Sequence, residues 1–201
     1  MNNPSQRPIT NAPTNEAPGP SAKPKRTILV GAGVIAAVLA VLIGVLATRK
    51  STDGQVARST MPGKPAPEIA SRSIIDGKLV KLSSYRGKYV LLNFFSTTCV
   101  PCVQEHPAIK AFAEKHAKIG DAAVIAVLFP PANKPDSIEF WAKRGGTWPL
   151  LDDERAIPDY GVTGIPESFL IGPEGVIRAK ITGGVKLKRL EALLAQAKLR
   201  A

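Results

Sequence analysis

The only two cysteines of the chain follow shortly after a run of apolar residues, and this arrangement limits the folds available to it. The run is Tyr89–Phe95 (YVLLNFF), and it predicts a strand that is buried on both faces of a sheet. Cys99 and Cys102 come next, and the apolar spacing over residues 103–118 predicts a helix. The cysteine pair is therefore expected where a buried strand ends and a helix begins.

Three kinds of chemistry are compatible with two cysteines at this spacing. A structural disulfide across two intervening residues would constrain the unfolded chain very little, because the stabilisation grows with loop length. A zinc site needs about four ligands. His106 and His116 could supply two, but ten residues of helix would separate them by roughly 15 Å.

A redox pair fits the placement best. The partial positive charge at the start of a helix stabilises the reactive thiolate of Cys99. Cys102 stands one turn further, where it can attack a mixed disulfide formed at Cys99, and Pro101 is acceptable in a first helical turn. We therefore predict that Cys99 is the attacking thiol and Cys102 the resolving thiol.

The rest of the C-terminal part predicts an α/β domain over residues 61–201. Asp76 and Gly77 form a turn signal between two short strands, and Gly172-Pro173-Glu174-Gly175 forms another. The expected elements are strands over 74–75, 78–82, 122–129, 149–151, 167–171 and 176–181, and helices over 135–143 and 186–199, with Ile138, Phe140 and Trp141 as core candidates of the first of these helices. A cysteine pair beside such a pattern is typical of the thioredoxin-like fold, with a mixed central sheet flanked by helices.

The N-terminal part has a different character. Residues 1–26 contain six prolines among small polar residues, which predicts a disordered tail. Residues 28–47 carry no charge, and a helix of this length rises about 30 Å, the thickness of the hydrocarbon layer. We favour an uncleaved transmembrane anchor over 27–48 and a linker over 49–60; a cleaved signal peptide is the alternative, although its apolar region is usually only about 7–15 residues.

Charge does not orient this anchor and does not indicate nucleic-acid binding. Basic residues precede and follow the apolar run in similar numbers, so the positive-inside rule is close to a tie. The net charge of +11 is spread along the chain without a long basic run, a zinc finger or a basic helix. Nucleic acid is therefore not an expected partner.

From about residue 62 onward the sequence resembles the membrane-tethered thioredoxin-like proteins of the TlpA/ResA/DsbE group. The resemblance is carried by MPGKPAPEIA, LSSYRGKYVLLNFF and CVPCVQEHP, and by YGVTGIPESFLIGPEGVIRAKITGGV, which is most similar to the DsbE (CcmG) branch of cytochrome c maturation. It implies a thiol:disulfide oxidoreductase in the cell membrane, with a single membrane span and an extracytoplasmic catalytic domain. It also implies no cofactor beyond the redox-active disulfide between Cys99 and Cys102.

The resemblance implies four further site residues. Pro166 matches a cis-proline that faces the cysteine pair and leaves the backbone of Ile165 free to pair with an extended substrate; a trans proline that ends a turn is the alternative. Ile165 would also set an apolar environment for the sulfurs. Glu105 matches a carboxylate that exchanges a proton with Cys102, and Glu167 matches a residue that tunes the thiols or contacts a partner. For both glutamates, a surface charge is the alternative.

Two residues near the cysteines depart from the pattern or have no assigned role. Many relatives carry Trp where this chain has Thr98, whose hydroxyl could cap the helix. His106 is expected to be a solvated helix residue, with an influence on Cys102 as the alternative.

The expected function is reduction of the disulfide in the Cys-x-x-Cys-His haem site of apocytochrome c, with a membrane-embedded thiol donor that restores the reduced pair. A broader extracytoplasmic thiol reductase, for example one that serves metal-site assembly, is the alternative within this class. A peroxiredoxin would place Pro at position 92 and Thr or Ser at position 96; this chain has Leu92 and Ser96, so the proline is absent. A tethered binding module with structural cysteines is the non-enzymatic alternative.

Overall fold

The computed structural model describes residues 25–48, 55–56 and 60–200, with side chains for 33–45 and 60–200. The chain forms two compact units, which divide after Lys50. The described part of the first unit is the helix α1 (Lys25–Thr48). Within the described residues, no helix combines the length and the hydropathy needed to cross a membrane. Most of the predicted tail over 1–26 and most of the predicted linker over 49–60 lie outside the described residues, and Lys25 and Arg26 of the predicted tail begin α1.

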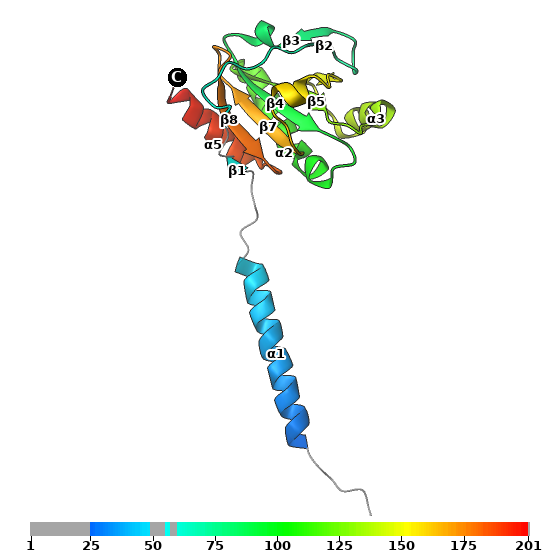
Figure 1. Ribbon diagram of the computed structural model, residues 1–201, viewed down its shortest axis with the longest axis vertical. Helices are drawn as coiled ribbons and strands as arrows, with labels where there is room; N and C mark the ends of the chain where they lie inside the picture. Colours follow the sequence, from blue (N-terminus) through cyan, green and yellow to red (C-terminus); the bar gives the residue numbers. More distant parts are fainter. Residues whose placement is uncertain (1–24, 49–54, 57–59, 201) are drawn as a thin grey trace, which may run out of the picture. The chain divides into compact units, whose positions relative to one another are not determined.

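The second unit is built on a six-stranded mixed sheet (Figure 1). Strands β4, β5 and β6 run parallel to one another, while β7 pairs antiparallel with β4, β8 with β7 and β1 with β8. Across the sheet the order is β1 (Gln55–Val56), β8 (Ile177–Thr182), β7 (Glu167–Ile171), β4 (Tyr89–Phe95), β5 (Ala122–Leu128) and β6 (Leu150–Leu151).

Alternate side chains of the central strand β4 enter two different apolar clusters, because successive residues of a strand point to opposite faces. Leu91 and Phe95 pack with side chains of α2 (Val100–Ile119), α3 (Lys134–Arg144) and α5 (Leu187–Lys198). Leu92 and Phe94 pack on the other face with residues from the hairpin and short helices that cover it. These are β2 (Ala70–Arg72), β3 (Leu79–Lys81), the 3-10 helix η1 (Leu82–Tyr85) and α4 (Ala156–Asp159).

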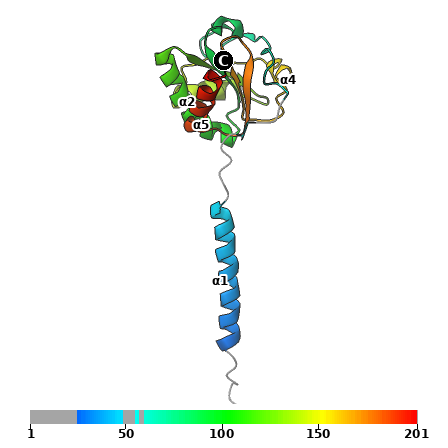
Figure 2. The same cartoon turned by 90° about the vertical axis from the view of Figure 1, so that its left-hand side faces the viewer.

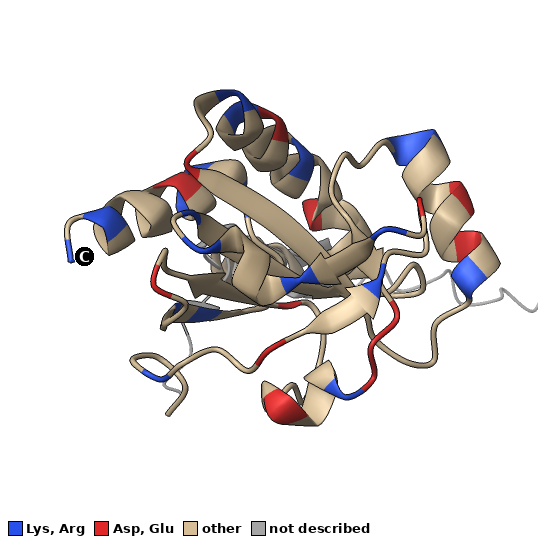
Figure 3. Ribbon diagram, turned by 90° about the horizontal axis from the view of Figure 1, so that it is seen from above, with Lys and Arg blue, Asp and Glu red and all other residues tan. Residues whose placement is uncertain are grey.

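The layers explain the distribution of charge in this unit. Helices α2 and α5 lie side by side on one face of the sheet (Figure 2). Lys, Arg, Asp and Glu are found mainly on the outer helices and loops, while the central strands carry few of them (Figure 3). The parallel strands β4 and β5 are covered on both faces, and their sequences are therefore almost continuously apolar.

The predicted α/β architecture with a mixed sheet is confirmed, and several boundaries differ. The first hairpin pairs Ala70–Arg72 with Leu79–Lys81, so Ile74 and Ile75 lie in its connection and not in a strand. Strand β1 lies within the predicted linker over 49–60 and was not predicted; its two residues pair with the end of β8. The short elements η1 and α4 were also missed, because neither is long enough to show a period.

One core candidate is wrong. Ile138 in α3 is 43% exposed. The buried side of this helix is set by Ser137 and Trp141, which are four residues apart and therefore stack on one face. Ile138 is about 100° away from Ser137 around the helix axis, and Phe140 packs at the edge of the cluster.

Candidate redox site

The cysteine pair lies at the junction of β4 and α2 and differs sharply in exposure between its two members. Cys99 and Cys102 form a disulfide with Cα atoms 5.2 Å apart. Cys99 is half-buried, whereas Cys102 is 0% exposed and belongs to the core cluster under α2. An incoming protein disulfide can therefore reach the sulfur of Cys99 and not that of Cys102.

The start of α2 is capped by a cysteine and not by Thr98, which corrects the expectation from the sequence. Cys99 has extended backbone angles at the N-cap position, and its Sγ accepts a hydrogen bond from the Cys102 amide at 3.3 Å. The exposed Thr98 hydroxyl instead lies 3.0 Å from Ser96 Oγ. Pro101 stands in the first turn, as predicted, and that turn contains no acidic residue. The helix dipole at Cys99 is therefore not opposed by a carboxylate in the same turn.

The loop that contains Pro166 lies next to the start of α2. The peptide bond between Ile165 and Pro166 is cis, as predicted. The Pro166 carbonyl accepts a hydrogen bond from the Gly183 amide at 2.9 Å. A Cβ atom placed on the next residue, Gly184, would lie 3.6 Å from the Pro101 carbonyl oxygen. The turn after β8 is therefore hydrogen-bonded to the proline loop and lies close to the first turn of α2.

Ile165, which precedes this proline, lies at the boundary of the domain's two apolar clusters. Its side chain is half-buried and packs against both apolar clusters of the domain. Its backbone makes no hydrogen bond within the described part of the chain. The peptide groups of Ile165 are thus open to an extended segment from another molecule.

Glu105 is buried, so its interpretation as a surface charge is wrong. It is 3% exposed and follows Cys102 by three residues on the buried side of α2. Its Oε1 accepts a hydrogen bond from Asn93 Nδ2 at 2.9 Å, and its Oε2 accepts one from the Val185 amide at 3.0 Å. Burial raises the pKa of Glu105 to about 7, against the lowering effect of these two hydrogen bonds.

We expect this raised pKa to make the oxidised protein less stable as the pH rises. Between about pH 4.5 and 7 the folded state keeps the Glu105 proton while the unfolded state has lost it. Glu105 by itself should therefore lower the free energy of unfolding by about 3 kcal/mol across this window, while the lowered pKa of His106 acts in the opposite direction. Urea unfolding at pH 4.5 and pH 8 should show a smaller fall for Glu105→Gln than for the wild type. Equal falls in the two proteins would contradict the assignment.

Glu167 is also buried, which excludes the surface-charge interpretation for this residue as well. Its Oε2 lies 3.0 Å from Lys180 Nζ, and the two side chains are 7% and 10% exposed. Lys180 Nζ also donates a hydrogen bond to the Gly161 carbonyl at 2.9 Å. The ion pair therefore joins β7 and β8 to the segment that leads into the proline loop. Sequence reasoning missed Lys180, although its place between Ala179 and Ile181 in an apolar strand was a signal.

His106 is a core residue and not a solvated helix residue. It is 3% exposed, and its Nε2 lies 2.6 Å from the Gly145 carbonyl oxygen. Aromatic rings surround the imidazole at centroid distances of 4.8–6.2 Å: Phe95, Phe140, Trp141 and Trp148. Burial lowers the pKa of His106, so this side chain is neutral at pH 7.

His116 is separated from the cysteines and has its own partners. Its Nδ1 lies 2.7 Å from Asp121 Oδ1, and its Nε2 lies 3.3 Å from Glu191 Oε1. These contacts join the end of α2 to α5. Among the side chains that the structure describes, no group of three or more His, Cys, Asp or Glu residues is arranged so that it could hold a metal ion.

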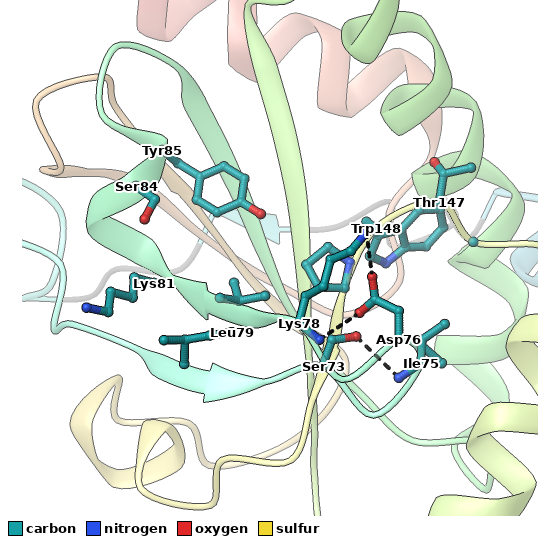
Figure 4. A pocket seen from close by; sticks show the side chains of 13 residues that line it. Ser73, Ile75, Asp76, Lys78, Leu79, Lys81, Ser84, Tyr85, Thr147 and Trp148 are labelled. Atoms are coloured by element: carbon teal, nitrogen blue, oxygen red, sulfur yellow. Dashed lines mark hydrogen bonds and ion pairs between the residues drawn. The ribbon is translucent and has the colours of Figure 1, made fainter.

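A hollow with a volume of about 330 Å³ lies elsewhere in the domain (Figure 4). It is lined by the turn between β2 and β3, by β3, by Ser84 and Tyr85 of η1 and by residues 146–149, and the ion pair between Asp76 and Lys78 forms part of the lining. None of the predicted site residues lines this hollow.

A buried and an accessible cysteine at a strand–helix junction, beside a cis-proline, define a thiol:disulfide oxidoreductase of the thioredoxin-like fold. The chain belongs to the redoxin family, whose model matches residues 61–194. It is 32% identical to the thiol-disulfide oxidoreductase ResA of Bacillus subtilis over 80% of this chain and 88% of ResA. It is 33% identical to the thioredoxin-like protein YneN of the same organism over 66% of this chain and 78% of YneN.

A solved structure agrees with this assignment. The thioredoxin-family thiol:disulfide interchange protein of Chlorobium tepidum superimposes with a TM-score of 0.61 at 26% identity. The match covers 69% of this chain and 98% of that protein. The predicted resemblance to the TlpA/ResA/DsbE group and the predicted enzyme class are confirmed.

Proposed function

We propose that the protein is a membrane-tethered, extracytoplasmic reductant that acts on apocytochrome c, at the disulfide of its Cys-x-x-Cys-His haem site. The observation that supports thiol:disulfide exchange is the asymmetry of the pair, and the family resemblance supports the direction of reduction. Cys99 is half-buried at a helix start, Cys102 is fully buried, and the buried carboxyl group of Glu105 stands one turn further on the same helix. This arrangement allows the Cys99 sulfur to attack the partner disulfide, while the buried Cys102 sulfur can react only with the mixed disulfide formed at Cys99.

The proposed cycle starts from the reduced pair. The Cys99 thiolate attacks one sulfur of the partner disulfide, and the other partner sulfur leaves as a thiolate. Cys102 gives its proton to Glu105 and attacks Cys99 Sγ, so the bond between Cys99 and the partner breaks and the Cys99–Cys102 disulfide forms. The partner gains two electrons and the pair loses two. A membrane-embedded thiol donor then reduces the pair again, without any further cofactor.

The membrane location is proposed from the first unit. Large apolar side chains of α1 between Val34 and Val45 are 51–66% exposed in that unit. Exposed apolar side chains of this number need a cover, and a lipid bilayer would provide it. Placement of the domain outside the cytoplasm follows the family resemblance, since the charges that flank the run do not orient it.

The choice of substrate rests on the segment around Pro166. Gly164-Ile165-Pro166-Glu167 resembles the DsbE branch, and the burial of Glu167 supports a role for it within the site. A broader thiol reductase that serves metal-site assembly remains the second candidate within the class.

Trapping in cells should identify the partner. Cys102→Ala removes the resolving thiol, so the mixed disulfide at Cys99 should accumulate. We expect apocytochrome c to be the main protein released from the purified adduct by dithiothreitol. Capture of a copper chaperone, or of a broad set of proteins without apocytochrome c, would reject the proposed substrate. The double variant Cys99→Ser/Cys102→Ala is the matched control and should capture nothing.

A further inference from the structure

Asn93 is the only polar residue in the buried strand β4. It is 2% exposed and, like Leu91 and Phe95, points to the face of the sheet that α2 covers. A buried side-chain amide is costly unless its donors and acceptors are paired. Its presence among six large apolar side chains therefore calls for an explanation.

The contacts of this amide join three elements at the redox site. Asn93 Nδ2 donates one hydrogen bond to Glu105 Oε1 at 2.9 Å and another to Ser168 Oγ at 3.0 Å. Asn93 and Ser168 are direct partners in the register between β4 and β7. The Val185 amide donates to the other oxygen of Glu105. Each carboxylate oxygen of Glu105 thus has one neutral donor.

We propose that Asn93 is a positioning residue of the redox site, whose amide fixes the Glu105 carboxylate on the buried side of the cysteine pair and stabilises its ionised form. This inference rests on the proposed function, in which Glu105 accepts the Cys102 proton before Cys102 attacks Cys99 Sγ. Proton transfer needs a stable orientation of the acceptor and a proton affinity close to that of the donor.

The proton affinity of the Glu105 carboxylate is set by its burial and by a few neutral groups around it. Burial raises its pKa, and the two hydrogen bonds from Asn93 and Val185 lower it; no charged group contributes to the shift. The groups that contact its carboxylate are the amides of Asn93 and Val185 and, through Asn93, the Ser168 hydroxyl, and Cys102 precedes it by three residues on the buried side of α2. Loss of one donor should therefore have a clear effect, because no ion pair compensates for it.

The first measurement is direct titration of Glu105 by carbon-13 NMR of the labelled side-chain carboxyl group in oxidised protein. In Asn93→Leu we expect the midpoint to rise by about one pH unit, because one of two hydrogen bonds to the ionised form is lost. Glu105→Gln identifies the resonance. A midpoint within 0.2 units of wild type, taken as roughly the precision of the method, would overturn the proposal.

Two variants keep the test informative if Asn93→Leu fails to fold. Asn93→Asp has nearly the same shape and places a second carboxyl group beside Glu105, so the two should share a proton and the Glu105 midpoint should rise further. Ser168→Ala is the matched control: it removes the other partner of the Asn93 amide and should leave the midpoint near the wild-type value. A large shift in Ser168→Ala with none in Asn93→Asp would also overturn the proposal.

Kinetics separate this inference from the proposed function. With a model disulfide peptide, Asn93→Leu should keep the rate at which Cys99 forms the mixed disulfide. The release step that needs Cys102 should slow by about tenfold at pH 7. Adding Asn93→Leu to Glu105→Gln should cause no further slowing, because both act through one carboxyl group. If wild type does not reduce the peptide while the NMR shift is present, the proposed function fails and the coupling of Asn93 to Glu105 stands.

Discussion

Replacement of Cys99 by serine should reduce the rate of thiol:disulfide exchange by about 10³-fold or more. The thiolate is the nucleophile in this chemistry, and a serine hydroxyl is not ionised at neutral pH. The fully buried Cys102 cannot replace it, because it is 0% exposed. The rate is measured as reduction of a fluorescent disulfide peptide by pre-reduced protein.

Cys102→Ser is the matched control for this result. It should keep the first covalent step, so that Cys99 still reacts with iodoacetamide and still forms a mixed disulfide, while release of the reduced peptide stops. In the reduced wild type, alkylation at increasing pH should modify Cys99 before Cys102, since Cys99 is accessible at the start of α2. Alkylation of Cys102 first, or full exchange activity in Cys99→Ser, would contradict the roles assigned to the two sulfurs.

Lys180→Met should destabilise the domain by about 3–5 kcal/mol. The substitution keeps much of the side-chain volume but removes the ammonium group that lies 3.0 Å from Glu167 Oε2 and 2.9 Å from the Gly161 carbonyl oxygen. Glu167 would then be a buried charge without a partner. Because both side chains are at most 10% exposed, solvent would compensate for little of this loss.

Urea unfolding at pH 7 measures the effect, and an exposed ion pair provides the comparison. Lys78 lies 3.2 Å from Asp76, and their side chains are 82% and 45% exposed, so Lys78→Met should change the free energy of unfolding by less than about 1 kcal/mol. The double variant Lys180→Met/Glu167→Gln should recover much of the stability lost in Lys180→Met. Similar effects of Lys180→Met and Lys78→Met would show that the buried pair has no special contribution.

Much of the fold could be predicted because its elements have strong local signals. The bounds of β4 were predicted without error, since six large apolar residues within a run of seven, between polar flanks, indicate a strand buried on both faces. The redox role of the cysteine pair followed from its place in the sequence, and the cis-proline was implied by the family resemblance. The β2–β3 pairing was less accurate, because Ile74 and Ile75 suggested a strand where the structure has the connection.

The environment of individual side chains was predicted less well. His106 and Glu105 are neighbours in the sequence, both polar and both on α2, and both are buried. Helical periodicity identifies a buried face from its apolar residues, so it assigns polar residues to solvent. Only the aromatic rings around His106, and the donors that reach Glu105 from β4 and from the turn after β8, reveal their surroundings.

The sequence by itself determined the fold class and the position of the cysteine pair between a buried strand and a helix, while the role of Pro166 was implied by the family resemblance. These features depend on residue type and local spacing, which a single chain segment contains. The tertiary structure decided how deeply Cys102, Glu105 and Glu167 are buried, and that Asn93 and Lys180 are the partners of the two glutamates. Those properties depend on contacts between residues 12 to 13 positions apart along the chain, and on strand register, which brings Asn93 opposite Ser168.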